Sequence, residues 1–347
     1  MKRKLHKQEM IDIVKGATFL GAGGGGSPKV ALPIVEQIRE ATLLKPEDIS
    51  DNSNVVVMAG VGSPVVSVNV GYRGELITAL EIFEEVVGKR IDYIVPFETG
   101  GANFSKPIHA GAAKGLPIVD GDGAGRAVPE LQMTMFSIQG IPIAPLSLAD
   151  SKGNSAILYP VDAYIAEKLA RAVTTVFGGI AGLVCQIMTG KQLKDTAIPD
   201  TLSTAERVGK AIREAKECMR DPVGAVIEAI GGTVLAKGKI AKKTEEVKAG
   251  FDYGRVFLED IIVDYKNENM IAWRDSKPII MAPDSICWLT TDGEPLTNAD
   301  VKEGLEVAAI GKRAHEKWKT PEGSKLFGHI LESIGYKGGY IAFEEWE

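Results

Sequence analysis

The sequence is poor in the residues that most often build metal and redox sites. It has four histidines and three cysteines in 347 residues. His-Glu-x-x-His, His-x-His and Cys-x-x-Cys patterns are all missing, so the spacing predicts no zinc site. Cys185, Cys218 and Cys287 are far apart and odd in number, which is typical of reduced thiols in a reducing compartment. Cys185 and Cys287 stand in apolar runs and are expected to be buried.

Long apolar runs and an excess of basic residues are also missing. No segment reaches the roughly 18 uninterrupted apolar residues that a membrane helix needs, and the N-terminus has no signal-peptide core. The net charge of −6 disfavours a nucleic-acid partner, whose phosphates require a basic face. We therefore expect a cytoplasmic protein with neither a membrane nor a nucleic-acid partner. The one basic cluster, residues 237–243, is predicted to be a solvated hairpin.

The common catalytic motifs are missing as well. There is no Gly-x-Ser-x-Gly, Ser-x-x-Lys or Walker sequence. A glycine run at residues 21–26 formally matches Gly-x-Gly-x-x-Gly, but it follows a predicted helix at residues 8–20, whereas a nucleotide fingerprint follows a strand. No nucleotide cofactor is therefore expected. The amides of Gly23, Gly24 and Gly25 are predicted to bind a substrate oxyanion or carboxylate, with a flexible hinge as the alternative.

What the sequence does contain is an alternation of short apolar runs and amphipathic segments. This pattern predicts an α/β domain over residues 1–231, with a mostly parallel sheet and flanking helices. From residue 232 to 315 the chain is rich in β-branched residues and turn signals, which predicts a β-rich barrel or sandwich. Residues 316–347 are expected to form a tail that docks back onto the α/β domain.

Polar side chains follow two of the predicted strands. Glu98 and Asn103 come after the run at residues 91–97, and Asp120 and Asp122 come after the run at residues 116–119. Ligands of open α/β sheets bind at the carboxyl ends of strands, and sequential strands are usually neighbours. We therefore expect these side chains to face one cleft. Pro129 predicts that a helix begins near Glu130, because proline fits the first turn.

The stretch from Asp120 to Glu130 is open to several interpretations. An EF-hand calcium loop is excluded, since Ala124 and Leu131 stand where oxygen ligands are required. Asp120 and Asp122 are candidates for a general base or for ligands of a divalent metal ion, and Arg126 is a candidate anion clamp. The structural alternative is that the aspartates cap the next turn while Arg126 pairs with Glu130.

Four stretches together resemble a known family. They are the glycine run, Glu98-Thr99-Gly100-Gly101-Ala102-Asn103, Asp120-Gly121-Asp122-x-x-Gly125-Arg126-Ala127-x-Pro129-Glu130-Leu131-Gln132, and Trp318-x-Thr320-x-Glu322-Gly323. The chain is similar to the family named after S-methyl thiohydantoin desulfurase, first catalogued beside hydantoin-utilisation genes. The resemblance spans nearly the whole chain. It implies an N-terminal α/β domain, a C-terminal β-rich domain and a role in the breakdown of hydantoin-like cyclic ureides.

This resemblance suggests a hydrolytic or desulfurising site. Asp120 or Asp122 is assigned the base or metal-ligand role, and Arg126 the anion clamp, with Glu130 completing the catalytic set. Glu98 and Asn103 are expected to orient the ring. The alternative is a non-catalytic subunit or ligand-binding partner of a hydantoinase-type enzyme. The sequence leaves open whether the protein forms a homo-oligomer or binds such a partner enzyme.

Overall fold

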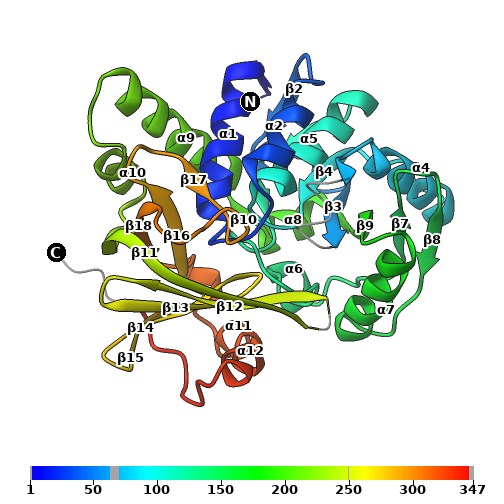
Figure 1. Cartoon of the computed structure of the whole chain (residues 1–347). Helices are drawn as coiled ribbons and strands as arrows, with labels where there is room; N and C mark the ends of the chain where they lie inside the picture. Colours follow the sequence, from blue (N-terminus) through cyan, green and yellow to red (C-terminus); the bar gives the residue numbers. More distant parts are fainter. Residues whose placement is uncertain (1, 63–69, 249, 344–347) are drawn as a thin grey trace.

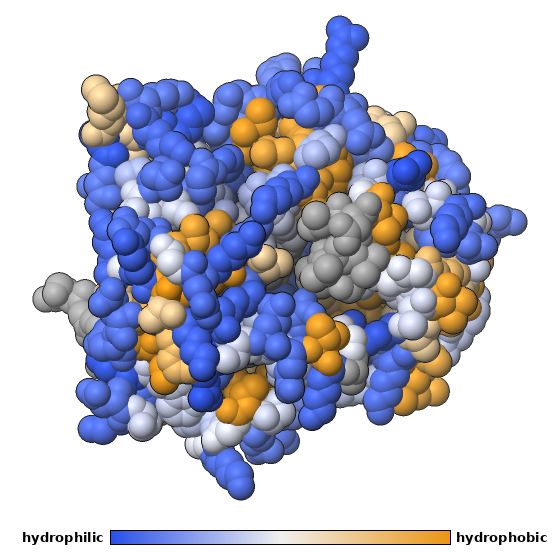
Figure 2. Space-filling view, viewed as in Figure 1, coloured by the Kyte–Doolittle hydropathy of each residue, from blue (hydrophilic) through white to orange (hydrophobic). Residues whose placement is uncertain are grey.

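The computed structural model describes residues 2–62, 70–248 and 250–343. The chain forms an α/β part and a separate antiparallel β-sheet, which lie beside each other in Figure 1. Both parts were predicted, and the structure confirms the fold class. On the face shown in Figure 2, hydrophilic residues predominate and apolar residues form separate groups.

The sheet of the α/β part has the strand order β1-β2-β5-β4-β3-β9-β7-β8. Its central strands β2, β5, β4 and β3 are parallel, and the flanking strands pair antiparallel. The central strands are short and almost entirely buried, as expected for a sheet that helices cover. The bounds are β1 Arg3–Leu5, β2 Ala41–Leu44, β3 Asn54–Gly62, β4 Tyr93–Pro96, β5 Ile118–Val119, β7 Leu146–Ala149, β8 Ser155–Leu158 and β9 Ile180–Thr189.

Helices cover this sheet, and a pair of two-residue strands, β6 and β10, lies beside it. The predicted helices in the regions of α1, α4, α7, α9 and α10 are present. Helices α1 and α9 approach each other so closely that only glycine fits at position 16. A Cβ there would lie 1.8 Å from the carbonyl oxygen of Ala205. The bounds are α1 Lys7–Leu20, α2 Pro28–Val35, η1 Pro46–Asp48, α4 Glu75–Val87, α5 Gly101–Lys114, β6 Gly121–Asp122, α6 Met135–Ile138, α7 Ala163–Val176, α8 Gly190–Thr196, β10 Ile198–Pro199, α9 Thr201–Glu217 and α10 Pro222–Ile230.

The prediction that a helix begins near Pro129 is wrong. Residues 127–134 are not helical, and α6 begins only at Met135, where the Thr134 side chain caps it. The amide of Val128 donates to the Glu98 carboxylate, and the amide of Leu131 donates to Glu167. Carboxylates therefore satisfy backbone donors in this segment and hold it in an irregular path.

The second sheet has eight antiparallel strands in the order β15-β14-β13-β12-β11-β18-β16-β17. Strand β11 is sixteen residues long and pairs with β18 through its first half and with β12 through its second. The predicted hairpin at residues 237–243 is therefore wrong, since these residues lie inside one strand. The bounds are β11 Thr233–Lys248, β12 Phe251–Leu258, β13 Ile261–Lys266, β14 Glu268–Arg274, β15 Lys277–Met281, β16 Ser285–Thr290, β17 Pro295–Leu296 and β18 Glu306–Lys312.

The C-terminal segment contacts both parts of the molecule. It contains η2 Glu316–Trp318, α11 Pro321–Leu326 and α12 Gly328–Ser333. Trp318 is buried, and its indole nitrogen donates to the carbonyl oxygen of Ala124 at 2.7 Å. Phe343 is buried in the core of the β-sheet. Residues 344–347 of the predicted tail lie outside the described residues.

Two further features of the described residues bear on the sequence analysis. Cys185 and Cys287 are buried, as predicted, and Cys218 is exposed. No helix in this part of the chain has the length and apolar character needed to cross a membrane.

Candidate functional site

The glycine run forms a turn that links the β-sheet part to helix α5 of the α/β part. The carbonyl oxygen of Ala22 accepts from Asn269 at 2.8 Å, and that of Gly23 accepts from the amide of Asn298 at 2.7 Å. On the other side, the carbonyl of Gly25 accepts from the amide of Ala102, the second residue of α5, at 3.0 Å.

Glycine is required in this turn for steric reasons. Gly25 has a φ of 74°, and a Cβ there would lie 2.5 Å from the Cα of Gly100. A Cβ at Gly24 would lie 2.1 Å from Oε1 of Glu268. These contacts favour a packed crossing between the two parts of the chain over the flexible hinge.

A cavity of about 190 Å³ lies beside this turn, between the α/β part and the β-sheet. Clefts between domains are common binding sites for small molecules. Six of the predicted site residues line it, and Asp120, Asp122 and Arg126 are not among its lining residues. The six are Gly23, Gly24, Gly25, Glu98, Asn103 and Glu130.

Glu98 follows β4 and presents its carboxyl group to the cavity. One oxygen accepts from the side-chain amide of Asn103 at 2.6 Å, and the other accepts from the amide of Val128. Asn103 lies in the first turn of α5, so the helix fixes the position of the carboxyl group. Burial and the negative charge of Glu268 raise the pKa of Glu98 well above its usual range.

Glu268 begins β14 and approaches the same cavity from the β-sheet. Its side chain is buried, and its Oε2 has no hydrogen-bond partner among the described residues. Burial raises the pKa of Glu268 despite the nearby positive charge of Arg126. The sequence does not single out this residue, because it lies among the strands and turns predicted for residues 232–315 and matches no motif.

Glu98 and Glu268 line the same cavity, and the negative charge of Glu268 acts on Glu98. Two like charges in a desolvated site cannot both ionise readily, so the pair favours holding a proton. One member can then accept a proton while the other donates one.

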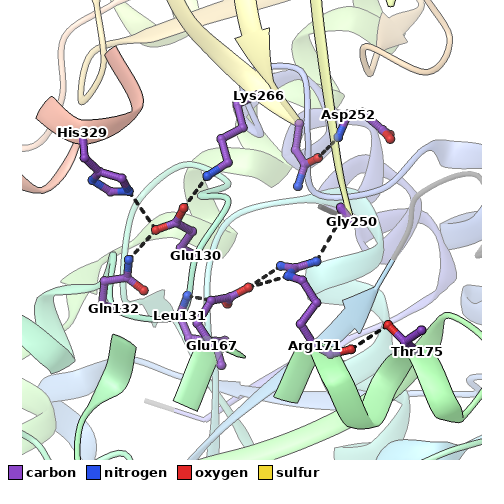
Figure 3. A network of polar contacts seen from close by, with 11 residues as sticks. Glu130, Leu131, Gln132, Glu167, Arg171, Thr175, Gly250, Asp252, Lys266 and His329 are labelled. Atoms are coloured by element: carbon purple, nitrogen blue, oxygen red, sulfur yellow. Dashed lines mark hydrogen bonds and ion pairs between the residues drawn. The ribbon is translucent and has the colours of Figure 1, made fainter. Parts of the chain in front are cut away.

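A network of charged side chains borders the cavity, and its members Glu130, Glu167 and Arg171 line it (Figure 3). We call this network the rim of the cavity. Glu130 accepts from Lys266 and lies 2.9 Å from Nε2 of His329. Glu167 accepts from the amide of Leu131 at 3.1 Å and from Arg171. The network ties the irregular segment after Arg126 to α7, to the β-sheet and to α12.

Asp120 and Asp122 bind different partners within the protein. Asp120 accepts from the amide and the hydroxyl of Ser203. Asp122 accepts from the Thr99 hydroxyl at 2.6 Å and from the amides of Ala124 and Gly125. Burial raises the pKa of both carboxyls, that of Asp122 to about 6. Asp122 thus caps its own turn, as the structural alternative stated.

The contacts of these aspartates give no support to a metal-ligand role, because protein donors already occupy their oxygens. Within residues 2–62, 70–248 and 250–343, no group of three or more His, Cys, Asp or Glu side chains is placed to hold a metal ion. The catalytic roles assigned to Asp120 and Asp122 stay predictions.

Arg126 is a buried link between the two parts of the molecule. Its guanidinium donates to the carbonyl oxygens of Asn269, Asp284 and Pro283 at 2.7, 2.7 and 3.2 Å. The ion pair with Glu130, which was the structural alternative for Arg126, is not present, since Glu130 pairs with Lys266 and His329. The contacts of Arg126 place it in the interface, while its role as an anion clamp stays a prediction.

Comparisons with known proteins cover both parts of the chain. Residues 8–160 match the model of the S-Me-THD-like N-terminal domain, and residues 161–341 match that of the S-Me-THD-like C-terminal domain. The X-ray structure of a protein from Chromobacterium violaceum is similar with a TM-score of 0.86 and 25% sequence identity. The alignment covers 99% of this chain and 100% of that one. No curated protein sequence matches the chain significantly.

Proposed function

The chain belongs to the S-Me-THD-like family, and from this premise we propose that it acts on a hydantoin-type ring and hydrolyses the C–S bond of an S-alkyl thiohydantoin. The observation that carries the proposal is the pair Glu98 and Glu268, two carboxyl groups with raised pKa values at one interdomain cavity. Desolvated carboxyls of this kind suit proton transfer near neutral pH.

The reaction adds water to the ring carbon that bears sulfur. The ionised glutamate takes a proton from water as the new C–O bond forms, and the protonated glutamate gives its proton to the adjacent ring nitrogen. The C–S bond then breaks with its electron pair on sulfur, and loss of the hydroxyl proton leaves the hydantoin carbonyl. The products are a hydantoin and a thiol, so the elements of one water molecule are consumed.

The assignment of the ionised and the protonated member follows the neighbouring charges. The positive charge of Arg126 favours the ionised form of Glu268, and the negative charge of Glu268 raises the pKa of Glu98. The Oε2 of Glu268 has no hydrogen-bond partner within the described chain, so it can accept from water. We therefore assign the general base to Glu268 and the general acid to Glu98. The amides of the glycine run are proposed to bind the polarised ring oxygen.

The test uses S-methyl thiohydantoin as the probe, with thiol release and hydantoin formation as readouts. We expect Glu98→Gln and Glu268→Gln each to lower kcat/KM by about 10²-fold or more. The exposed Glu85→Gln serves as the matched control and should keep full activity.

Two outcomes contradict the proposal. Wild-type protein that releases no thiol rules out the reaction on this probe. If it nevertheless binds the ureide tightly, the non-catalytic binding partner becomes the better interpretation. Full activity in both glutamine variants rejects the carboxyl pair while leaving the reaction standing.

A further inference from the structure

Lys106 lines the cavity, and no carboxylate of the described residues is in contact with it. It is 7% exposed, and the described residues offer its ammonium group no hydrogen bond or ion pair. A Cβ at Gly60 would lie 2.6 Å from its Nζ, so the glycine leaves room for the lysine head group. A buried, unpaired ammonium is costly, and proteins keep such groups where they are used.

A cluster of polar side chains surrounds the same lysine. The ring centre of Tyr72 is 5.9 Å from its Nζ, and His109 packs edge-on against Tyr72. The Tyr72 hydroxyl, Oε1 of Glu75 and Nδ1 of His109 are all buried without hydrogen-bond partners among the described residues. Burial lowers the pKa of Lys106, and the negative charge of Glu75 opposes that shift.

Helix α5 fixes the position of Lys106 relative to Asn103 and so to the Glu98 carboxyl group. Asn103, which binds Glu98, and Lys106 are three residues apart and both line the cavity. Residues at this spacing lie on one face of a helix, about 4.5 Å apart along its axis. A five-membered ring bound between them can therefore present its ring nitrogen to Glu98 and its sulfur substituent to Lys106.

We propose that Lys106 is a further catalytic residue, the general acid that protonates the departing sulfur. This inference rests on the proposed function. As the C–S bond breaks, its electron pair goes to sulfur and one proton of the ammonium moves to the same atom, which gives a free thiol and a neutral amine. The proton from the collapsing hydroxyl passes to the carboxylate and, through water, restores the ammonium. Glu75 acts as a positioning residue that keeps the amine protonated through its charge.

The decisive experiment varies the leaving group. We compare Lys106→Met with wild type on S-methyl thiohydantoin and on its S-(4-nitrophenyl) analogue, whose thiolate leaves without protonation. We expect kcat/KM to fall about 10²-fold or more on the methyl compound and less than about threefold on the aryl compound. Lys89→Met, at an exposed position, is the control and should match wild type on both.

Equal losses on both compounds overturn the inference, because a structural role affects them alike. Failure of the proposed function is distinct, since wild type then releases neither thiol.

A second measurement tests the catalytic role of Lys106 even if the Lys106→Met variant folds poorly. The ammonium must be protonated to act, so activity falls as the pH rises through its pKa. Glu75→Gln removes the charge that raises this pKa, so the alkaline limb of kcat should move to lower pH. Tyr72, His109 and Glu98 stay unchanged in this variant. An unmoved limb contradicts the role of Lys106.

Discussion

Glu130 is the residue whose ionisation holds the rim of the cavity together. Burial would raise its pKa, but hydrogen bonds from His329 and Lys266 outweigh burial and lower the pKa to about 2. A carboxyl with a depressed pKa stabilises the fold above its unfolded pKa, and that stability is lost as the pH falls toward 2.

We therefore predict that the free energy of unfolding of the wild type declines between about pH 4.3 and pH 2. In Glu130→Gln this decline should be smaller by about 1–2 kcal/mol. The figure allows for solvent screening, because the site is partly exposed. Urea denaturation at a series of pH values measures it. Parallel curves for the variant and the wild type would contradict the prediction.

At the same scale, the site residues differ in how far the sequence reveals them. Glu98 and Asn103 could be predicted because they stand in the segment that leads from a strand into the next helix, where α/β sheets bind ligands. Glu268 lies 170 residues later and reaches the cavity only through packing of the two sheets, so no spacing pattern marks it. Lys106 lies inside a helix, where a lysine usually faces solvent.

At the scale of elements, the turn between α1 and α2 sets the position of Glu268. Gly24→Ala should fold, because this glycine does not have a positive φ, but the new Cβ would displace the Glu268 carboxyl. We predict a loss of about 1–3 kcal/mol in stability together with a fall in thiol release. Gly328→Ala is the control, since nothing lies within 4 Å of its Cβ position. Equal behaviour of the two variants in thermal unfolding and turnover would reject this role of the turn.

The elements also show where local sequence rules stop working. Helix α1 has the apolar spacing of a surface helix and was predicted correctly. The helix after Pro129 failed because Glu98 and Glu167, distant in sequence, take the amides at Val128 and Leu131. Tertiary contacts override a local signal when a side chain from another element offers the backbone a better acceptor.

At the scale of the whole molecule, the sequence predicts the two parts but not how they join. The mostly parallel sheet follows from the alternation of strands and helices, yet β9 returns to pair antiparallel with β3. Such pairing depends on contacts far apart along the chain. The interface itself rests on the buried Arg126, which the sequence suggested as a ligand for substrate.

The last prediction concerns this interface. Arg126→Met would leave three carbonyl oxygens of the β-sheet part without their donor, which should cost about 3 kcal/mol or more. All four tryptophans follow residue 272, whereas helices α1 to α10 all precede residue 231. Because Trp318 contacts Ala124 of the α/β part, all proteins are compared with Trp318 and Trp346 replaced by Phe. Fluorescence of Trp273 and Trp288 then reports on the β-sheet, and helical circular dichroism reports mainly on the α/β part. The two unfolding transitions should coincide in the wild type and in the exposed control Arg39→Met, and separate in Arg126→Met. Coincident transitions with unchanged midpoints in the variant would show that Arg126 does not couple the two parts.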